Sequence, residues 1–307
     1  MTNPAKEEIK AEIKKLAKEK DAVILAHYYV DGDIQDIADY VGDSYALAKT
    51  ARNDPRKTIV FCGVTFMGES ACILNPDKTV LVPNPTAVCP MALMVDPAKI
   101  AEMRAKYDDL AVVCYINSTA EIKALSDVIV TSSNALKIVK SLPNKNIFFI
   151  PDGNLGRYVA EQFPEKNIIL NTGYCHVHTS ITARAVEECF HQHQGAKVIT
   201  HPECPKEVVD ISDYIGSTKE LIEFVKNDDG QEYIVCTESG VLHEMEKVAP
   251  GKKFYCVGAK QICPNMKKIT LENIRDCLIN NTPQAHCSEE IRLSSCKPLD
   301  RMLEIAK

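Results

Sequence analysis

Short apolar runs alternate along the chain with longer stretches in which apolar residues recur every three or four positions. Continuous β-branched runs are typical of parallel strands buried on both faces, and the longer period is typical of helices that cover such strands. The pattern therefore predicts an α/β fold in which strands and helices alternate. The clearest strands are expected at residues 22–26, 58–62, 79–82, 110–114, 146–150, 167–170, 196–200, 232–236 and 253–256.

Amphipathic helices are expected at residues 7–18, 98–106 and 181–193, each just before an apolar strand. The segment after each of these strands reads alike: HYYVDGDIQDIADYVGDSYAL from His27, YINSTAEIKALSDVIVTSSNAL from Tyr115 and HPECPKEVVDISDYIGSTKEL from His201. Residues 27 and 115 are 88 positions apart, and residues 115 and 201 are 86 apart. The same two steps relate four further triplets: Tyr29, Asn117 and Glu203; Asp39, Asp127 and Asp213; Ser44, Ser132 and Thr218; Pro76, Pro164 and Pro250. A register kept in three copies indicates an internal repeat.

Each copy predicts the same unit of four strands with helices between them. The remaining strand of each unit is expected to end near Gly42, Val130 or Gly216. A unit of about 85 residues has a small core, so we expect the three units to pack together about a pseudo-threefold axis. This division assigns residues 1–94, 95–179 and 180–267 to three repeated α/β units with short parallel sheets, and residues 268–307 to a C-terminal helix and closing tail.

The composition is ordinary for a globular protein, with 45% hydrophobic and 25% charged residues. The formal net charge of −6 gives no support for nucleic acid or an anionic membrane surface as a partner. The stretch from Lys6 to Lys20 is rich in lysine and glutamate, unlike an apolar signal segment. No apolar run approaches the roughly 18 residues of a membrane span. We therefore expect a cytoplasmic protein.

Cysteine is the unusual component, because 13 is a high and odd number for such a chain. Disulfides are rare in a reducing cytosol, so we interpret the cysteines as buried or metal-binding, with burial as the default. The repeat singles out Cys89, Cys175 and Cys263, which follow the last strand of each unit and are 86 and 88 positions apart. Three thiolates around one axis can hold three irons of a 4Fe-4S cluster and leave the fourth iron open. An open iron can act as a Lewis acid, which suits elimination of water.

Polar residues recur where ligands of parallel α/β units bind, beyond the carboxyl ends of the strands. The position after the first strand carries His27, Tyr115 or His201, and two positions later stand Tyr29, Asn117 or Glu203. After the second strand come Ser44, Ser132 and Thr218, which we expect to cap the next helix and to offer donors to anions. Histidines and serines at such places often have only a structural role. A structural device would repeat itself, however, whereas this diversity suits an asymmetric small substrate.

Together these residues resemble the quinolinate synthases, iron–sulfur enzymes of NAD biosynthesis. The resemblance runs from LAHYY through GDSYALA, VCPMA, CYINST, VTSSNA, GYCHVH, HPEC, GSTKEL and ICPNM to the terminal RML. The chain departs from some members near Cys263, where Val257 and Lys260 stand in place of two further cysteines.

The resemblance implies one 4Fe-4S cluster per chain on Cys89, Cys175 and Cys263. It implies condensation of iminoaspartate (iminosuccinate) with dihydroxyacetone phosphate to quinolinate, with loss of phosphate and water. The implied substrate-binding residues are His27, Ser44, Tyr115, Ile116, Asn117, Ser132, His201, Pro202, Glu203 and Thr218. On chemical grounds we assign proton transfer to Glu203 and His201, with Tyr29 as a further acid–base candidate. An enzyme that makes iminoaspartate, L-aspartate oxidase or aspartate dehydrogenase, is the implied functional partner.

Three other functions stay open at this point. One is a three-cysteine iron–sulfur reductase that removes a hydroxyl in isoprenoid synthesis. Another is a metal or redox sensor, against which the varied polar set speaks because a sensor needs no substrate-shaped pocket. The third is a triplicated module that binds sugar phosphates and has incidental cysteines. Fold alone would separate none of them.

Overall fold

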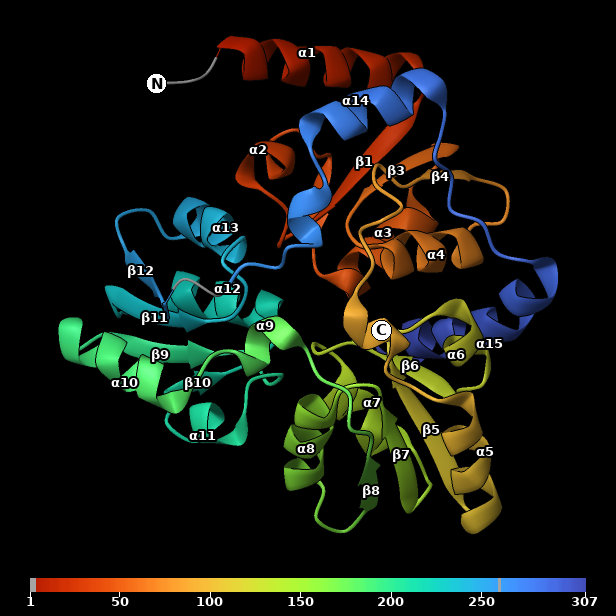
Figure 1. Ribbon diagram of the computed structural model, residues 1–307, viewed down its shortest axis with the longest axis vertical. Helices are drawn as coiled ribbons and strands as arrows, with labels where there is room; N and C mark the ends of the chain where they lie inside the picture. Colours follow the sequence, from red (N-terminus) through yellow and green to blue (C-terminus); the bar gives the residue numbers. More distant parts are fainter. Residues whose placement is uncertain (1–3, 259–260) are drawn as a thin grey trace.

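The computed structural model describes residues 4–258 and 261–307, and three α/β units surround a common centre in it (Figure 1). Each unit contains one four-stranded, wholly parallel sheet. The strand orders are β2-β1-β3-β4, β6-β5-β7-β8 and β10-β9-β11-β12, which is the same topology three times. The predicted fold class, three repeated α/β units with short parallel sheets, is confirmed.

The elements follow one another in the same order in each unit. The first contains α1 (Pro4–Glu19), β1 (Ala22–His27), α2 (Gly32–Gln35), β2 (Tyr40–Gly42), α3 (Ser44–Asn53), β3 (Thr58–Cys62), α4 (Thr65–Leu74), β4 (Thr79–Leu81) and the short turn η1 (Pro90–Leu93). The second contains α5 (Pro97–Lys106), β5 (Leu110–Tyr115), α6 (Ala120–Ala124), β6 (Val128–Val130), α7 (Ala135–Ser141), β7 (Asn146–Ile150), α8 (Gly153–Gln162), β8 (Asn167–Leu170) and the short helix α9 (His176–Thr179). The third contains α10 (Ala183–Gln192), β9 (Lys197–Thr200), α11 (Lys206–Val209), β10 (Tyr214–Ile215), α12 (Thr218–Asn227), β11 (Glu232–Cys236), α13 (Val241–Val248) and β12 (Lys253–Cys256).

The predicted strands agree closely with the observed ones. β3, β7, β8, β11 and β12 have the predicted bounds, and the other four named strands differ by one residue at one end. His27 and Tyr115 extend β1 and β5 because they pair with Gly42 and Val130 of the neighbouring strands.

The aspartate shared by the three copies joins the first strand of each unit to the chain before the second. Its carboxylate accepts a hydrogen bond from a first-strand N–H, and its own N–H donates to the carbonyl of that same residue. The pairs are Asp39 with Ile24, Asp127 with Val112 and Asp213 with Val198, at 2.7–2.9 Å. The repeated aspartate is therefore a structural device that satisfies both backbone groups of one residue.

A lysine two positions after each repeated proline closes the end of a helix. The Nζ of each lysine donates to two carbonyls at or just beyond the C-terminal end of α3, α7 or α12: Lys78, Lys166 and Lys252. The last carbonyls of a helix have no intrahelical partner and carry partial negative charge, so a cation there stabilises the end.

The tail forms more structure than the single helix we predicted. It contains η2 (Met266–Lys268), α14 (Leu271–Asn280) and α15 (Glu289–Ile305). α14 packs on α1 of the first unit, and α15 packs on α6 of the second unit and α4 of the first. α15 contains the buried Pro298. An internal proline normally ends or kinks a helix, which hid this one in the sequence.

The hydrophobic core is divided unequally between the units. One cluster joins the first unit, the second unit and the two tail helices. The third unit has two clusters of its own, one including Ile234 and the other including Leu221. The third unit thus packs as a separate body against a larger double unit.

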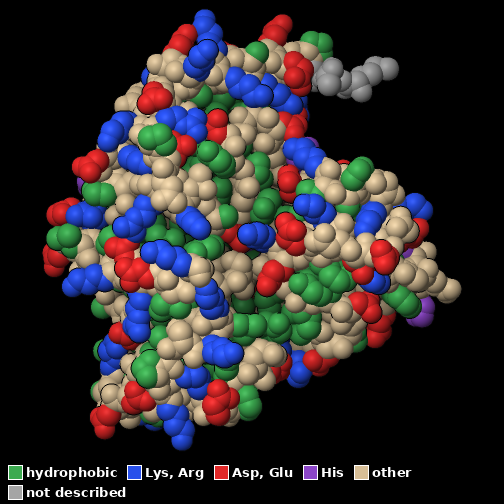
Figure 2. Space-filling model, turned by 180° about the vertical axis from the view of Figure 1, so that it is seen from behind, with side chains coloured by type: hydrophobic (Ala, Val, Ile, Leu, Met, Phe, Trp, Pro, Cys, Tyr) green, Lys and Arg blue, Asp and Glu red, His purple; other side chains and the backbone are tan. Residues whose placement is uncertain are grey.

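The surface carries both signs of charge. Figure 2 shows Lys and Arg side chains interspersed with Asp and Glu over the face that it presents, and hydrophobic side chains in the hollow between the units. No described helix combines the length and the apolar run that a bilayer crossing requires.

Candidate functional site

A cavity lies where the three units meet, and all three line it. It encloses about 760 Å³ of empty space, its open mouth included. The polar and cysteine side chains of its wall are His27, Tyr29, Asp43, Ser44, Cys89, Tyr115, Asn117, Thr131, Ser132, Cys175, His176, His178, His201, Glu203, Thr218, Glu238 and Cys263.

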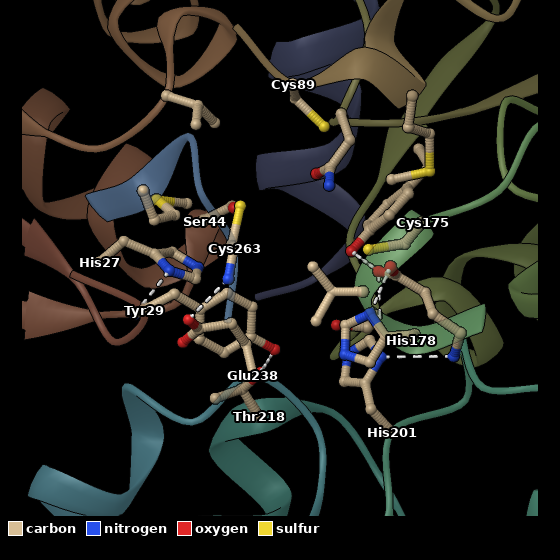
Figure 3. A pocket seen from close by; sticks show the side chains of 18 of the residues that line it. His27, Tyr29, Ser44, Cys89, Cys175, His178, His201, Thr218, Glu238 and Cys263 are labelled. Carbon is tan, nitrogen blue, oxygen red and sulfur yellow. Dashed lines mark hydrogen bonds and ion pairs between the residues drawn. The ribbon is translucent and has the colours of Figure 1, made fainter. Parts of the chain in front are cut away.

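The three cysteines that the repeat singles out converge on this cavity. Figure 3 shows the sulfurs of Cys89, Cys175 and Cys263 pointing into it from three sides. Each sulfur stands at the start of a short helical turn, and the backbone N–H groups that face it come from Met91 and Ala92, from His178, or from Asn265 and Met266. Such N–H donors stabilise a thiolate and are typical of cysteines that bind iron–sulfur clusters.

Burial acts in the opposite direction on these thiols. It raises the pKa of Cys89 to about 12 and also raises the pKa of Cys175 and of Cys263. Ionisation of these partly buried thiols is therefore unfavourable without a counter-charge, which a bound cationic group would supply. The donor set of three thiols with facing amides fits an iron–sulfur group.

The histidines that end β1 and follow β9 share one geometry. The Nδ1 of His27 accepts the Tyr29 N–H at 3.1 Å, and the Nδ1 of His201 accepts the Glu203 N–H at 3.3 Å. Burial lowers the pKa of both imidazoles to about 3, so both are neutral at physiological pH. With Nδ1 used as an acceptor, the proton of each ring lies on Nε2. Each ring can then donate a hydrogen bond through Nε2.

Glu203 is an acid of the cavity wall that contacts side chains of the second unit. Its Oε1 accepts the Tyr115 hydroxyl at 2.5 Å, and its Oε2 lies 3.1 Å from Nδ1 of His178. Burial alone would raise the pKa of this carboxyl, but His178, His201 and the Tyr115 hydroxyl together lower the pKa to about 2. Glu203 is consequently a buried, ionised acceptor.

Tyr29 connects the first unit to the third. Its hydroxyl lies 2.6 Å from Oγ1 of Thr218 and 2.9 Å from Oγ1 of Thr237. Thr237 in turn lies 2.9 Å from Nε2 of His178. Burial raises the pKa of Tyr29 well above its usual value, so the phenol stays protonated. A continuous chain of hydrogen bonds therefore runs from Tyr29 through Thr237 and His178 to Glu203.

Two polar atoms of the cavity wall are buried with no hydrogen-bond partner among the described residues. They are Oδ1 of Asn117 and Oδ2 of Asp43. Buried acceptors are nearly always satisfied in folded proteins. A ligand with N–H or O–H groups would supply the missing donors.

Most of the residues predicted from the sequence line the cavity, but two do not. Ile116 is 1% exposed and belongs to the large hydrophobic cluster, and Pro202 is also buried. Neither is among the lining residues. Both stand between two lining residues of a loop, so their side chains turn away from the cavity. Val257 is buried beside the third-unit core, and Lys260 lies outside the described residues.

The expected helix caps at Ser44, Ser132 and Thr218 were wrong by one or two residues. The N-cap residues are Asp43, Asn134 and Ser217. Asp43 accepts the Ala46 N–H, and Ser217 forms a capping box with Glu220. Because a neighbour caps the helix, the hydroxyls of Ser44 and Thr218 are left to face the cavity.

Sequence reasoning missed several residues of the site, above all His178, Thr237, Asp152 and Glu238. Asp152 and Glu238 are 86 positions apart, so the repeat could have found them. His178 stands three residues after Cys175 but has no polar equivalent in the other copies, where Ala92 and Met266 follow the cysteine at the same distance. Only the fold shows that His178 meets Glu203.

One cysteine of the triad also belongs to a second group of possible metal ligands. The nearest ligand atoms of Cys175, His178 and Glu203 lie within 4.8 Å of one another. Because it contains Cys175, this set overlaps the cysteine site and does not form a second one.

Comparison with known proteins agrees over nearly the whole chain. Residues 11–304 match the family described as Quinolinate synthetase A protein. The quinolinate synthase of Fusobacterium nucleatum is 53% identical over 298 residues, covering 97% of this chain and 99% of the relative. Those of Caldicellulosiruptor bescii and Clostridioides difficile are 49% and 48% identical, and each alignment covers at least 96% of both chains.

Proposed function

The chain belongs to the quinolinate synthetase A protein family, and from this premise we propose which of its residues hold the cofactor, bind the substrates and move protons. The family's enzymes act in NAD biosynthesis. They condense iminoaspartate with dihydroxyacetone phosphate and release phosphate and water to give quinolinate. The proposal concerns how this cavity carries out that reaction.

Cys89, Cys175 and Cys263 hold one 4Fe-4S cluster. The observation that carries this assignment is their convergence: each comes from a different unit, and all three sulfurs point into one cavity. Three ligands leave one iron without a protein donor, and a bound cluster supplies Lewis acidity toward the hydroxyl that leaves as water. The facing amides of the three turns stabilise the thiolates.

The hydroxyls around the cavity bind the anionic groups of the substrates. Ser44 and Thr218 are the first residues of α3 and α12, where backbone N–H groups and the helix dipole favour negative charge. Ser132 contributes a hydroxyl from the second unit, and Asn117 offers an unpartnered buried oxygen to a donor of the substrate. Carboxylates and phosphate are thus held without an arginine in the wall.

Proton transfer is assigned to the network around Glu203. The carboxylate is ionised before substrate binds, so it can accept a proton during enolisation or ring closure. Tyr115, bonded to Glu203, orients the intermediate beside Asn117. His201 is neutral and donates through Nε2, so it stabilises a developing oxyanion more readily than it accepts a proton. Tyr29 stays a protonated phenol and can act as a general acid.

The three units, the cellular location and the source of iminoaspartate complete the proposed function. The divisions at residues 94, 179 and 267 mark the units that contribute the cysteines. All 13 cysteines are free in the structure, which suits a cytoplasmic location. Iminoaspartate would come from an enzyme that oxidises aspartate, such as L-aspartate oxidase or aspartate dehydrogenase.

Anaerobic purification followed by iron and sulfide analysis and a quinolinate assay tests this function. We expect about four irons per chain, the number in one such cluster, and product from iminoaspartate and dihydroxyacetone phosphate. A cluster without product would favour the reductase or the sensor. No cluster after reconstitution without oxygen would refute the cysteine assignment.

A pair of cysteine variants sharpens the test. Cys263→Ala should lose the cluster and the activity. Cys236→Ala is the control from the same unit, because Cys236 is a buried cysteine that lies in β11 and does not line the cavity. Equal iron contents in the two variants would contradict the assignment of Cys263.

A further inference from the structure

The loop that carries each cluster cysteine is attached to its own unit by one repeated backbone hydrogen bond. In each unit the N–H at or near the start of the helix after the third strand donates to the carbonyl two residues before the cysteine. The pairs are Thr65 with Ala87, Gly153 with Gly173 and Ser239 with Gln261, at 2.8–2.9 Å. This hydrogen bond is present in all three units, so it does not distinguish the three cysteines.

A second attachment is present in only two of the units. Oδ2 of Asp152 accepts the backbone N–H of Cys175 at 3.1 Å, and Oε1 of Glu238 accepts the backbone N–H of Cys263 at 3.0 Å. Both carboxylates are fully buried. The repeat places Val64 at the equivalent position in the first unit, and valine has no acceptor for Cys89.

The other oxygen of each carboxylate is also occupied. Oδ1 of Asp152 accepts the Leu155 N–H at 2.7 Å and caps α8, and Oε2 of Glu238 accepts the Gly240 N–H at 2.6 Å just before α13. Each carboxylate therefore bridges a helix start and a cysteine loop. Amides lack this capacity, because a carboxylate can accept with both oxygens and an amide with only one.

The two acidic groups differ in their further partners. Nζ of Lys267 lies 3.5 Å from Oε1 of Glu238 and also donates to the Tyr29 carbonyl at 2.9 Å. Among the described residues, no lysine, arginine or histidine forms an ion pair with Asp152, whose partners are backbone N–H groups. Burying a polar group is unfavourable unless its hydrogen bonds are formed, so the two acids are better explained by these bonds than by packing alone.

We propose that Asp152 and Glu238 are positioning residues that fix Cys175 and Cys263 before the cluster binds. Cys89 has no such carboxylate on its N–H, and its loop is joined to η2 only farther from the cysteine, through Asn84 and Lys268. The inference rests on the proposed cluster site. A preformed pair of ligands reduces the ordering cost of cluster binding, since two of the three cysteines are already in place. Outer-shell hydrogen bonds of this kind commonly change metal affinity by about 10–100-fold.

Amide hydrogen exchange of the cluster-free protein tests the positioning directly. In Asp152→Asn we expect at least about tenfold faster exchange in residues 173–177, which a lost hydrogen bond of about 1.4 kcal/mol would produce. Glu238→Gln should have the same effect on residues 261–265. Peptides around Cys89 should keep their rates in both variants. Unchanged exchange in both loops would overturn the proposal, even if the wild-type protein contained no cluster.

Cluster retention provides the second measurement. In the anaerobic holoenzyme, an iron chelator should extract iron about 10-fold faster from Asp152→Asn and Glu238→Gln than from the wild type. The swapped residues Asp152→Glu and Glu238→Asp should restore retention at least in part, because the repeat itself accepts either acid at this position. Chelator rates equal to wild type in both amide variants would refute the positioning role.

A matched control separates positioning from general destabilisation. Thr270→Ala removes the N-cap of α14, whose Oγ1 accepts the Asn273 N–H, and it touches no cysteine loop. It should lower the melting temperature without changing loop exchange or the rate of iron extraction. Equal acceleration of iron extraction in Thr270→Ala would assign the effect to stability and overturn the proposal.

Discussion

The third unit differs from the first two although the three sheets have one topology. The first and second units share a hydrophobic cluster with α14 and α15, whereas the third packs around two clusters of its own. Yet the third unit supplies His201, Glu203 and Thr218, and it also contributes Thr237 to the network that links Tyr29 with Glu203. The difference shows that a repeated scaffold can concentrate stability in one part and acid–base chemistry in another.

The largest effect is expected from loss of the Glu203 carboxylate, which tests whether the third unit supplies the acid–base chemistry. Glu203→Gln should lower kcat by about 10²–10⁴-fold, the usual loss when an acid–base group is removed, while iron and sulfide contents stay at the wild-type values. The measurement is quinolinate formation under anaerobic conditions. Glu232→Gln is the control, since Glu232 lies in β11 of the same unit and its carboxylate accepts hydrogen bonds from Lys253 and Tyr255, away from the cavity. Wild-type activity in Glu203→Gln would contradict the assignment of proton transfer to the third unit.

The next effect tests whether the third unit is stabilised by a core of its own. Leu299 of α15 and Leu221 of α12 are both fully buried, the first in the shared cluster and the second in the third unit. Replacing either leucine by alanine should cost about 2–5 kcal/mol of stability. Amide exchange should then quicken in β1 and β5 for Leu299→Ala, but in β9 and β11 for Leu221→Ala. If Leu221→Ala loosened β1 and β5 equally, the third unit would not be a separate body.

Acid should affect the first and third units but not the second. His27 and His201 have a pKa lowered from 6.5 to about 3 by burial, and Tyr115 takes their place in the second unit. Because the unfolded chain binds these protons more readily, stability is fully present above pH 6.5 and is lost as the pH falls from 6.5 toward 3. The loss should approach about 1 kcal/mol per pH unit for each histidine.

Melting of the cluster-free protein at pH 7.5 and 5.5 measures this loss. His27→Gln should remove the contribution of His27 to the acid-dependent loss of stability, so the melting temperature should change less with pH. His191→Gln, an exposed position on α10, should leave it as in the wild type. A His27→Gln protein as acid-sensitive as the wild type would show that the sensitivity has another origin.

The smallest effect concerns the junction between the first and third units. Thr218→Val removes the 2.6 Å contact with the Tyr29 hydroxyl, which keeps its 2.9 Å contact with Thr237. A net loss of about 1 kcal/mol corresponds to about a fivefold increase in KM. Steady-state kinetics with each substrate in turn would show it. A KM equal to that of the wild type for both substrates would exclude Thr218 from binding.

The helices and strands could be predicted well from the sequence, because three copies of each segment together show which residues form a strand or a helix. Five strands were predicted to the residue, since buried parallel strands consist of continuous β-branched runs and the same run appears three times. The repeated aspartates and prolines marked real structural devices, although their hydrogen bonds were visible only in the fold. The tail has no second copy, and Pro298 inside α15 concealed a helix there.

The site was predictable only where it follows the repeat. The cysteine triad and the residues at the ends of the first strands met as expected, because equivalent positions of symmetric units must converge. Ser44 and Thr218 also line the cavity, but the caps of α3 and α12 are Asp43 and Ser217, because these side chains accept the N–H of the third helical residue. His178 could not be predicted, because its role depends on a contact between α9 and the loop after β9.

The distribution of the three cysteines over three units has a consequence for the lifetime of the protein. A cluster bound to residues 86 and 88 positions apart would act as a three-way cross-link of the chain. In the chain-entropy description, closing a loop of this length stabilises the folded state by about 4–5 kcal/mol. Loss of the cluster to oxygen would therefore loosen the association of the units as well as end catalysis. Turnover by cellular proteases would then follow oxidative damage directly, without a separate unfolding signal.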